Sequence, residues 1–222
     1  ANNTIATGST TSWTVNSPTP KTYYWVGGSG NWSDGSHWSN TSGGSPSGCS
    51  PTSIDDVVFD ANSFTAPGQA VTIDQTIIQC NNMNWTGVTN VPTLTGISTN
   101  TLRIFGSLTL APSMKYSFGG DVIFAATSAG KTITLEGKFL GRTFFNGIGG
   151  GWTFLDAFSC VNINLNNGSL DFNSQPVNAE LITAASSTRS IIMGSSVFTG
   201  TWLIDNSTNL TLNAGASTII VP

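Results

Sequence analysis

Short runs of alternating apolar and polar residues, separated by Gly and Asn turns, dominate this chain from about residue 93 onward. Leu102-Arg103-Ile104 is one such run, and Leu108-Thr109-Leu110 is the next. Alternation with a period of two is typical of half-buried β-strands, and here the runs recur about every 8 to 12 residues. No segment keeps apolar residues at helical spacing over three turns. The pattern therefore predicts an all-β fold with almost no helix.

A parallel β-helix-like solenoid and a β-sandwich both remain compatible with this alternation. The run at residues 161–166, Val-Asn-Ile-Asn-Leu-Asn, places apolar residues on one face and asparagines on the other, and residues 209–213 repeat that design. Asn next to Gly at strand ends suits the tight left-handed corners of a β-helix. Because the strands are short and numerous and the loops are short, we favour the solenoid, with the sandwich as the alternative.

Three regions of the chain differ in residue composition and pattern. Residues 1–20 form a polar extended tail that ends in Ser-Pro-Thr-Pro, residues 21–92 are aromatic and rich in turns, and residues 93–222 carry the short strands. A solenoid needs a cap over the end of its core, and the aromatic region lies where an N-terminal cap is expected. The alternative is a platform on which sugars stack. The aromatic residues concerned are Tyr23, Tyr24, Trp25, Trp32, Trp38 and Trp85.

The composition points to a folded extracellular protein. Only 8% of residues are charged, against about 25% in ordinary soluble domains, whereas 38% are hydrophobic. Ser, Thr, Asn and Gly must therefore supply the solubility, as in extracellular β-proteins. A net charge of -4 excludes the basic surface of a nucleic-acid-binding protein. No apolar run approaches the roughly 20 residues of a membrane span, and Ala1 opens a polar stretch, as the mature N-terminus of a secreted chain would.

No catalytic or cofactor-binding motif is present. One His excludes most His-dependent active sites, and the glycine-rich residues 27–30 and 147–151 complete no nucleotide-binding pattern. The one acidic cluster contains Asp55, Asp56 and Asp60. A hard cation needs several converging oxygen ligands, so we expect these acids to be solvated or to cap turns, and cation binding stays open. We predict a protein that is not an enzyme and holds no cofactor and no metal.

The cysteines and the glycosylation motifs are weaker signals. Cys49, Cys80 and Cys160 fit no metal or redox spacing. In an oxidising compartment Cys49 and Cys80 could form a disulfide and leave Cys160 as a buried thiol; the alternative is three unpaired, buried cysteines.

Asn-x-Ser/Thr motifs also arise by chance in a chain this rich in Asn, Ser and Thr. The possible glycosylation sites are Asn2, Asn31, Asn40, Asn84, Asn167, Asn206 and Asn209.

One stretch resembles a known group of proteins. Residues 24–33 read Tyr-Trp-Val-Gly-Gly-Ser-Gly-Asn-Trp-Ser, His37-Trp38 follows, and residues 51–60 read Pro-Thr-Ser-Ile-Asp-Asp-Val-Val-Phe-Asp. This resembles the opening of β-helical bacterial adhesins and autotransporter passengers, except that His37 stands where Asn is usual. The chain is also similar, over roughly residues 22–220, to Bacteroidetes-type β-helical surface and secreted repeat proteins. The resemblance implies a β-helix at the cell surface and carries over no catalytic residue.

The C-terminal residues suggest a strand that is open to pairing. Ile219, Ile220 and Val221 form an apolar run with no polar cap sequence behind it. An uncapped solenoid end or sheet edge is a template for another strand.

The N-terminal tail carries a pattern that could complete such an edge. Ile5, Trp13 and Val15 share one parity, so they would point to one face of an extended strand. We hypothesise that the tail of one copy adds a strand to its neighbour, which gives a head-to-tail filament or surface layer. The alternative is that the tail folds back on its own domain. The predicted function is thus an extracellular, adhesin-like structural subunit that binds copies of itself, with a polysaccharide-binding module and, less favoured, a β-helical lyase or hydrolase as alternatives.

Overall fold

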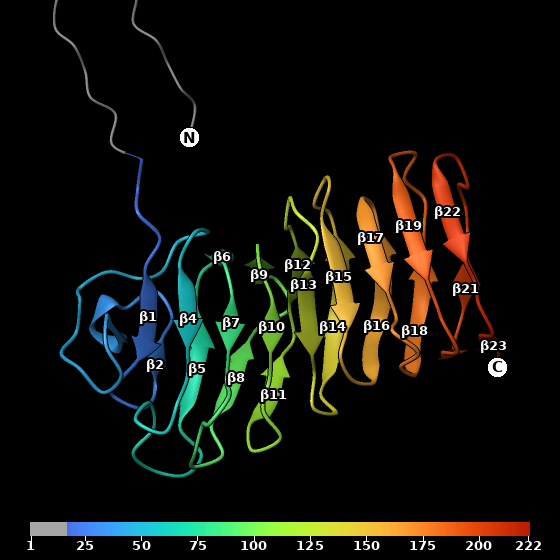
Figure 1. Cartoon of the computed structure of the whole chain (residues 1–222). Coiled ribbons are helices and arrows are strands. Elements are labelled where there is room, and N and C mark those ends of the chain that lie inside the picture. The colour runs from blue at the N-terminus through green and yellow to red at the C-terminus, as the bar shows by residue number, and fades with distance from the viewer. Residues whose placement is uncertain (1–16) are drawn as a thin grey trace, which may run out of the picture.

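The computed structural model describes residues 17–222 and contains three β-sheets wound into one solenoid (Figure 1). Successive turns of the chain, here called coils, stack along the solenoid axis from the N-terminal to the C-terminal end. Strands of neighbouring coils pair in parallel throughout the described residues, except that β1 and β3 pair antiparallel. The predicted parallel β-solenoid is therefore confirmed, and the sandwich alternative is wrong.

The sheets differ in length. Sheet A has ten strands, sheet C has nine and sheet B has four. In chain order, the strands of sheet A are β1 (Thr22–Trp25), β3 (Trp38–Ser39), β4 (Asp56–Val58), β7 (Met83–Asn84), β10 (Leu108–Thr109), β13 (Lys131–Thr134), β15 (Gly151–Phe154), β17 (Gly168–Asp171), β19 (Arg189–Ile192) and β22 (Leu210–Asn213). Sheet B contains β2 (Gly30–Asn31), β5 (Ala70–Ile73), β8 (Thr93–Gly96) and β11 (Lys115–Phe118). Sheet C contains β6 (Ile77–Cys80), β9 (Thr101–Ile104), β12 (Asp121–Phe124), β14 (Phe139–Phe145), β16 (Phe158–Leu165), β18 (Val177–Ile182), β20 (Val197–Thr199), β21 (Trp202–Leu203) and β23 (Thr218–Ile220).

The alternation seen in the sequence decides which side chains fill the solenoid. In β9 and β12, Leu102 and Val122 are in register and buried, whereas the residues between the buried positions face outward. The buried apolar residues of successive coils stack above one another, which gives one continuous core. The only helix among the described residues is a single 3-10 turn, η1 (Gly35–His37).

The coil becomes shorter along the chain. Asn82 and Ser107, which are hydrogen-bonded in adjacent coils, are 25 residues apart, whereas Asp121 and Arg142 are 21 apart. The change coincides with the end of sheet B at β11, after which each coil has two sheets instead of three. Sheets A and C run without a break across the boundary predicted between residues 92 and 93.

Tight corners allow this close stacking. Gly168 has φ +83, a left-handed conformation that L side chains rarely adopt. A Cβ at this position would also lie 2.5 Å from the carbonyl oxygen of Gly150 in the preceding coil. Glycine at this corner therefore satisfies both the backbone conformation and the spacing between coils.

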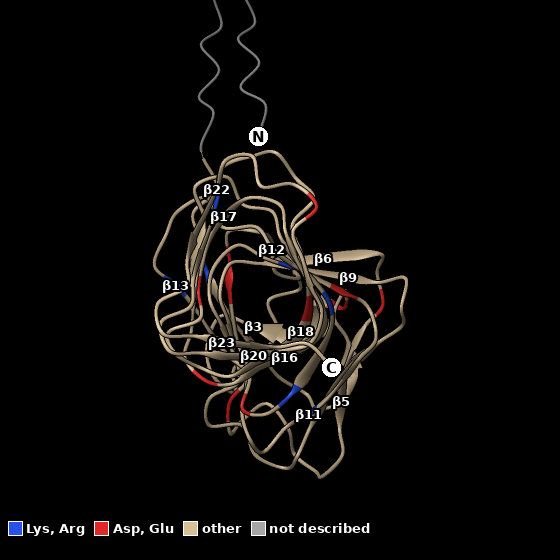
Figure 2. Ribbon diagram, turned by 90° about the vertical axis from the view of Figure 1, so that its right-hand side faces the viewer, with Lys and Arg blue, Asp and Glu red and all other residues tan. Residues whose placement is uncertain are grey.

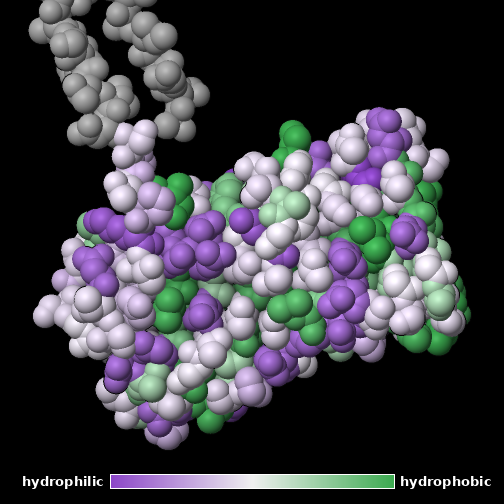
Figure 3. Space-filling model, viewed as in Figure 1, coloured by the Kyte–Doolittle hydropathy of each residue, from purple (hydrophilic) through white to green (hydrophobic). Residues whose placement is uncertain are grey.

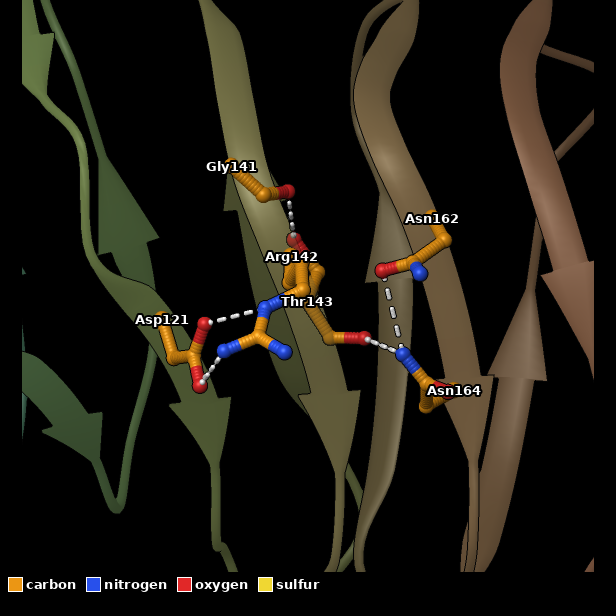
Figure 4. Close-up of polar contacts among 6 residues, drawn as sticks. All are labelled: Asp121, Gly141, Arg142, Thr143, Asn162 and Asn164. Atoms are coloured by element: carbon orange, nitrogen blue, oxygen red, sulfur yellow. Dashed lines mark hydrogen bonds and ion pairs between the residues drawn. The ribbon is translucent and has the colours of Figure 1, made fainter. Parts of the chain in front are cut away.

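Polar contacts link the coils on the outer face of sheet C (Figure 4). Arg142 donates from Nε and Nη2 to the two carboxylate oxygens of Asp121, at 2.8 and 2.9 Å. Asn164 donates from Nδ2 to Oδ1 of Asn162 at 3.1 Å and lies 3.4 Å from the carbonyl oxygen of Thr143. These groups are at the surface, so they add little free energy to the stack compared with the apolar core.

The predicted disulfide between Cys49 and Cys80 is wrong, because all three cysteines are free. Cys80 points into the core and is fully buried, whereas Cys49 lies on an exposed loop, so the two sulfur atoms face different environments. Cys160 is buried, but the exposure of Cys49 also contradicts the alternative of three buried thiols.

Among the described residues, 17–222, no helix has the length and apolar character that a membrane span requires.

Candidate functional site

The closed end of the solenoid, at its N-terminal side, is filled by stacked aromatic side chains. Trp25 and Trp32 both pack edge-on against Trp38, with ring centroids 5.0 and 4.8 Å apart. Phe59 stacks on Trp85 at 3.8 Å. These five side chains are at most 2% exposed. The Trp-rich cap is confirmed, and the four tryptophans offer no surface on which a sugar could stack.

Hydrogen bonds satisfy the indole nitrogens of Trp25 and Trp38 at the closed end, whereas the buried indole nitrogen of Trp85 has no partner among the described residues. The indole nitrogen of Trp38 donates to the carbonyl oxygen of Trp32, and that of Trp25 donates to the carbonyl oxygen of Gly28. The imidazole of His37 lies flat on Trp25, with ring centroids 4.8 Å apart, and its Nδ1 is 2.8 Å from the carbonyl oxygen of Val26. The one histidine of the chain is therefore part of the packing of this end.

A loop covers the strand edge at the closed end. β3 pairs with β1, and Ser39 of β3 then forms an antiparallel bridge with Pro46. The free edge of sheet A is thus occupied by the protein's own chain at this end.

The open end, at the C-terminal side, has a different surface. Leu212 lies in register with Ile191 of the preceding coil, and Ile219 lies in register with Phe198. Ile191 and Phe198 are fully buried, so Leu212 and Ile219 also point toward the interior, yet they are 43% and 41% exposed. Core-facing side chains are therefore half exposed in the last described coil.

The backbone at the open end is also unpaired. β22 and β23 are the outermost strands of sheets A and C, and among the described residues nothing pairs with their outer edges. Figure 2 views the molecule from this end and shows the coils superimposed, with few charged residues. The predicted assembly residues Ile219, Ile220 and Val221 all lie here, 41% to 64% exposed. Ile5, Trp13 and Val15 lie outside the described residues.

The predicted acidic cluster is a set of separate turn contacts. Asp55 accepts hydrogen bonds from the backbone nitrogens of Lys21 and Thr52, both at 2.9 Å. Asp56 accepts from the side chain of Asn81 and from Asn82, and Asp60 accepts from the backbone of Asn62. Within residues 17–222 no three metal-ligating side chains come together. These acids hold loops and adjacent coils in place, as the turn-capping interpretation expects.

The glycosylation motifs are spread over the molecule. Asn31, Asn40 and Asn209 are exposed, and the amide nitrogen of Asn209 donates to the carbonyl oxygen of Ser186. The partly buried sites are Asn84, Asn167 and Asn206, and Asn2 lies outside the described residues. Modification at these positions stays a prediction.

No protein-family model, curated protein or solved structure matches this chain. The resemblance to Bacteroidetes-type surface proteins therefore also stays a prediction, and the geometry of the two ends carries the functional argument.

Proposed function

We propose that this protein is an extracellular structural subunit that assembles head to tail through the open end of its solenoid. The observation that carries the proposal is the exposure of Leu212 and Ile219, which face the core but lack a covering layer. Exposed apolar surface beside an unpaired strand edge favours pairing with another chain.

The closed end offers no matching edge in sheet A. Its aromatic core is buried and the outer edge of β3 is occupied by the bridge from Ser39 to Pro46, so sheet A of one copy does not simply continue into β22 of another. Residues 1–16 of a neighbouring copy supply the missing strand instead. Their alternating Ile5, Trp13 and Val15 would place apolar side chains over Leu212 and Ile219. Sixteen residues in extended conformation span at most about 50 Å, which is enough to reach along a neighbouring coil.

A structural and non-catalytic role agrees with the remaining polar groups. The acids of the predicted cluster bind backbone and amide groups, and His37 is held against Trp25. Location outside the cell is proposed from the surface, whose solubility depends on Ser, Thr, Asn and Gly with only 8% charged residues.

Two independent changes test the assembly. Ile219→Asp places a charge on the open end, and deletion of residues 1–16 removes the donor strand. Ile148→Asp is the matched control, because Ile148 is 77% exposed but belongs to the loop before β15, away from both ends. We expect light scattering and negative-stain microscopy to show filaments for the natural chain and for Ile148→Asp, and monomers for the other two variants. A natural chain that stays monomeric at high concentration would contradict the proposal, as would unchanged filaments after either change.

A further inference from the structure

A hollow of about 420 Å³ lies on the outer face of sheet A, near the closed end, with Val57, Val58 and Met83 in its lining beside polar residues. Strands β1, β4, β7 and β10 form its floor, and its polar lining comes from Thr22, Asp56, Asn82, Asn84, Ser107 and Thr109. Hydrophilic side chains gather over this part of the sheet in Figure 3. None of the lining residues is Lys or Arg.

Register places these side chains in two lines parallel to the solenoid axis. Thr22 is in register with Asp56, and hydrogen bonds connect Asp56 to Asn82 and Asn82 to Ser107 in the following coils. The second line, two residues further along each strand, contains Tyr24, Val58, Asn84 and Thr109. Adjacent strands are about 4.8 Å apart, so polar groups repeat at that spacing along the hollow.

Contacts between coils hold this polar surface rigidly. Oδ1 of Asp56 accepts hydrogen bonds from Nδ2 of Asn81 and from both nitrogens of Asn82, at 2.8 to 3.1 Å. Oδ1 of Asn82 accepts from the backbone of Ser107, and Oγ of Ser107 accepts from the backbone of Thr132. Three polar groups of the hollow neither accept a hydrogen bond from the described residues nor donate one to them. They are Oδ2 of Asp56 and the hydroxyls of Thr22 and Thr109. The site thus combines fixed orientation with free hydrogen-bonding groups.

The chemistry of these free groups selects the ligand. A carboxylate oxygen and two hydroxyls bind hydroxyl groups well, and the negative Asp56 disfavours an anionic ligand. Tyr24, half-buried at the end of the second line, adds an aromatic ring beside the polar groups. Two parallel lines with a regular spacing fit an extended chain better than a compact molecule. We propose that the outer face of sheet A binds an extended neutral polysaccharide, which lies along the solenoid axis and is anchored at Asp56.

Binding in this hollow is independent of the assembly, because the hollow lies on a side face and not at either end. Native gels that contain hydroxyethyl cellulose, dextran or xylan provide the probes, and a gel with polygalacturonate tests an acidic polymer. Asp56→Asn keeps an oxygen for the contacts of Oδ1 and replaces the free oxygen by an NH₂ group. The double variant Thr22→Val/Thr109→Val removes the two free hydroxyls and leaves Asp56 unchanged. The control is Thr101→Val, a matched change on the outward side of β9 in sheet C.

We expect at least one neutral polymer to retard the natural chain and the Thr101→Val control equally. The double variant should bind roughly tenfold or more weakly, because two hydrogen bonds to the ligand are lost. Asp56→Asn should weaken binding at least as much, with circular dichroism verifying that both variants are folded. Absence of retardation by every neutral polymer, retardation by polygalacturonate alone, or equal retardation of all four proteins would overturn the proposal.

Discussion

The two ends of this solenoid both belong to one stack of parallel-paired coils but are finished differently. At the closed end, Trp25, Trp32 and Trp38 are buried, and β3 with its following loop occupies the strand edge. At the open end, Leu212 and Ile219 keep the inward orientation of the core and remain about two-fifths exposed. Because every coil pairs in parallel with the next, backbone pairing alone does not end the stack. The side chains at each end therefore decide whether another coil can be added there.

The largest expected effect is at the closed end. Trp38→Ala removes a fully buried ring that contacts Trp25, Trp32 and Phe59, and should lower the free energy of unfolding by about 3 to 5 kcal/mol. Trp202→Ala removes the same atoms from a partly exposed ring on Phe198 near the open end, and should cost less than half as much. Urea unfolding followed by circular dichroism measures both. Equal losses would show that the two ends are packed alike.

A smaller effect separates the last two coils. Ile191 and Leu212 occupy the same register position in β19 and β22, but only Ile191 is fully buried. Ile191→Ala should cost about 2 to 5 kcal/mol, whereas Leu212→Ala should cost on the order of 1 kcal/mol in the monomer. If Leu212→Ala costs as much as Ile191→Ala at concentrations where the chain is monomeric, another part of the same chain covers the open end.

An effect that is close to zero at neutral pH concerns the buried thiols of the interior. Burial raises the pKa of the Cys160 thiol to about 12, with the hydrogen bond to Thr143 acting in the opposite direction, and burial also raises the pKa of Cys80, with a smaller contribution from Asp56. The folded state therefore keeps these thiols protonated at pH values where the unfolded state, with a thiol pKa near 8.5, releases the proton. Stability should be constant with respect to these groups below about pH 8 and fall at up to about 1.4 kcal/mol per pH unit for each thiol above about pH 9.

Thiol labelling measures the same protection directly. At pH 8 a maleimide should modify the exposed Cys49 within minutes and should modify Cys80 and Cys160 only after urea unfolding. Rapid labelling of Cys160 in the native protein would mean that solvent enters the core from the open end.

Sequence patterns predicted the parts of this structure that depend on local alternation. The inward and outward positions of β9 and β12 follow from the period of two in residues such as Leu102 to Ile104. In β16 the prediction was wrong for Val161, which is 50% exposed because the register shifts between Ser159 and Asn162, whereas Ile163 and Leu165 point inward as expected. The cap could also be predicted, because Trp and Tyr residues cluster in one region, between Tyr23 and Trp85. The Cys49–Cys80 pairing failed because spacing along the chain does not tell which side chain points inward.

The sequence by itself determined the all-β alternation, the polar surface and the aromatic region, since each depends on residues that are neighbours in the chain. Only the tertiary structure decided the number of sheets in each coil, the contrast between the two ends and the hollow on sheet A. These features depend on coil length: Asn82 meets Ser107 25 residues later, and Asp121 meets Arg142 21 residues later. Such distant residues align only after the corners have set how much chain each coil contains, so a local pattern cannot reveal them.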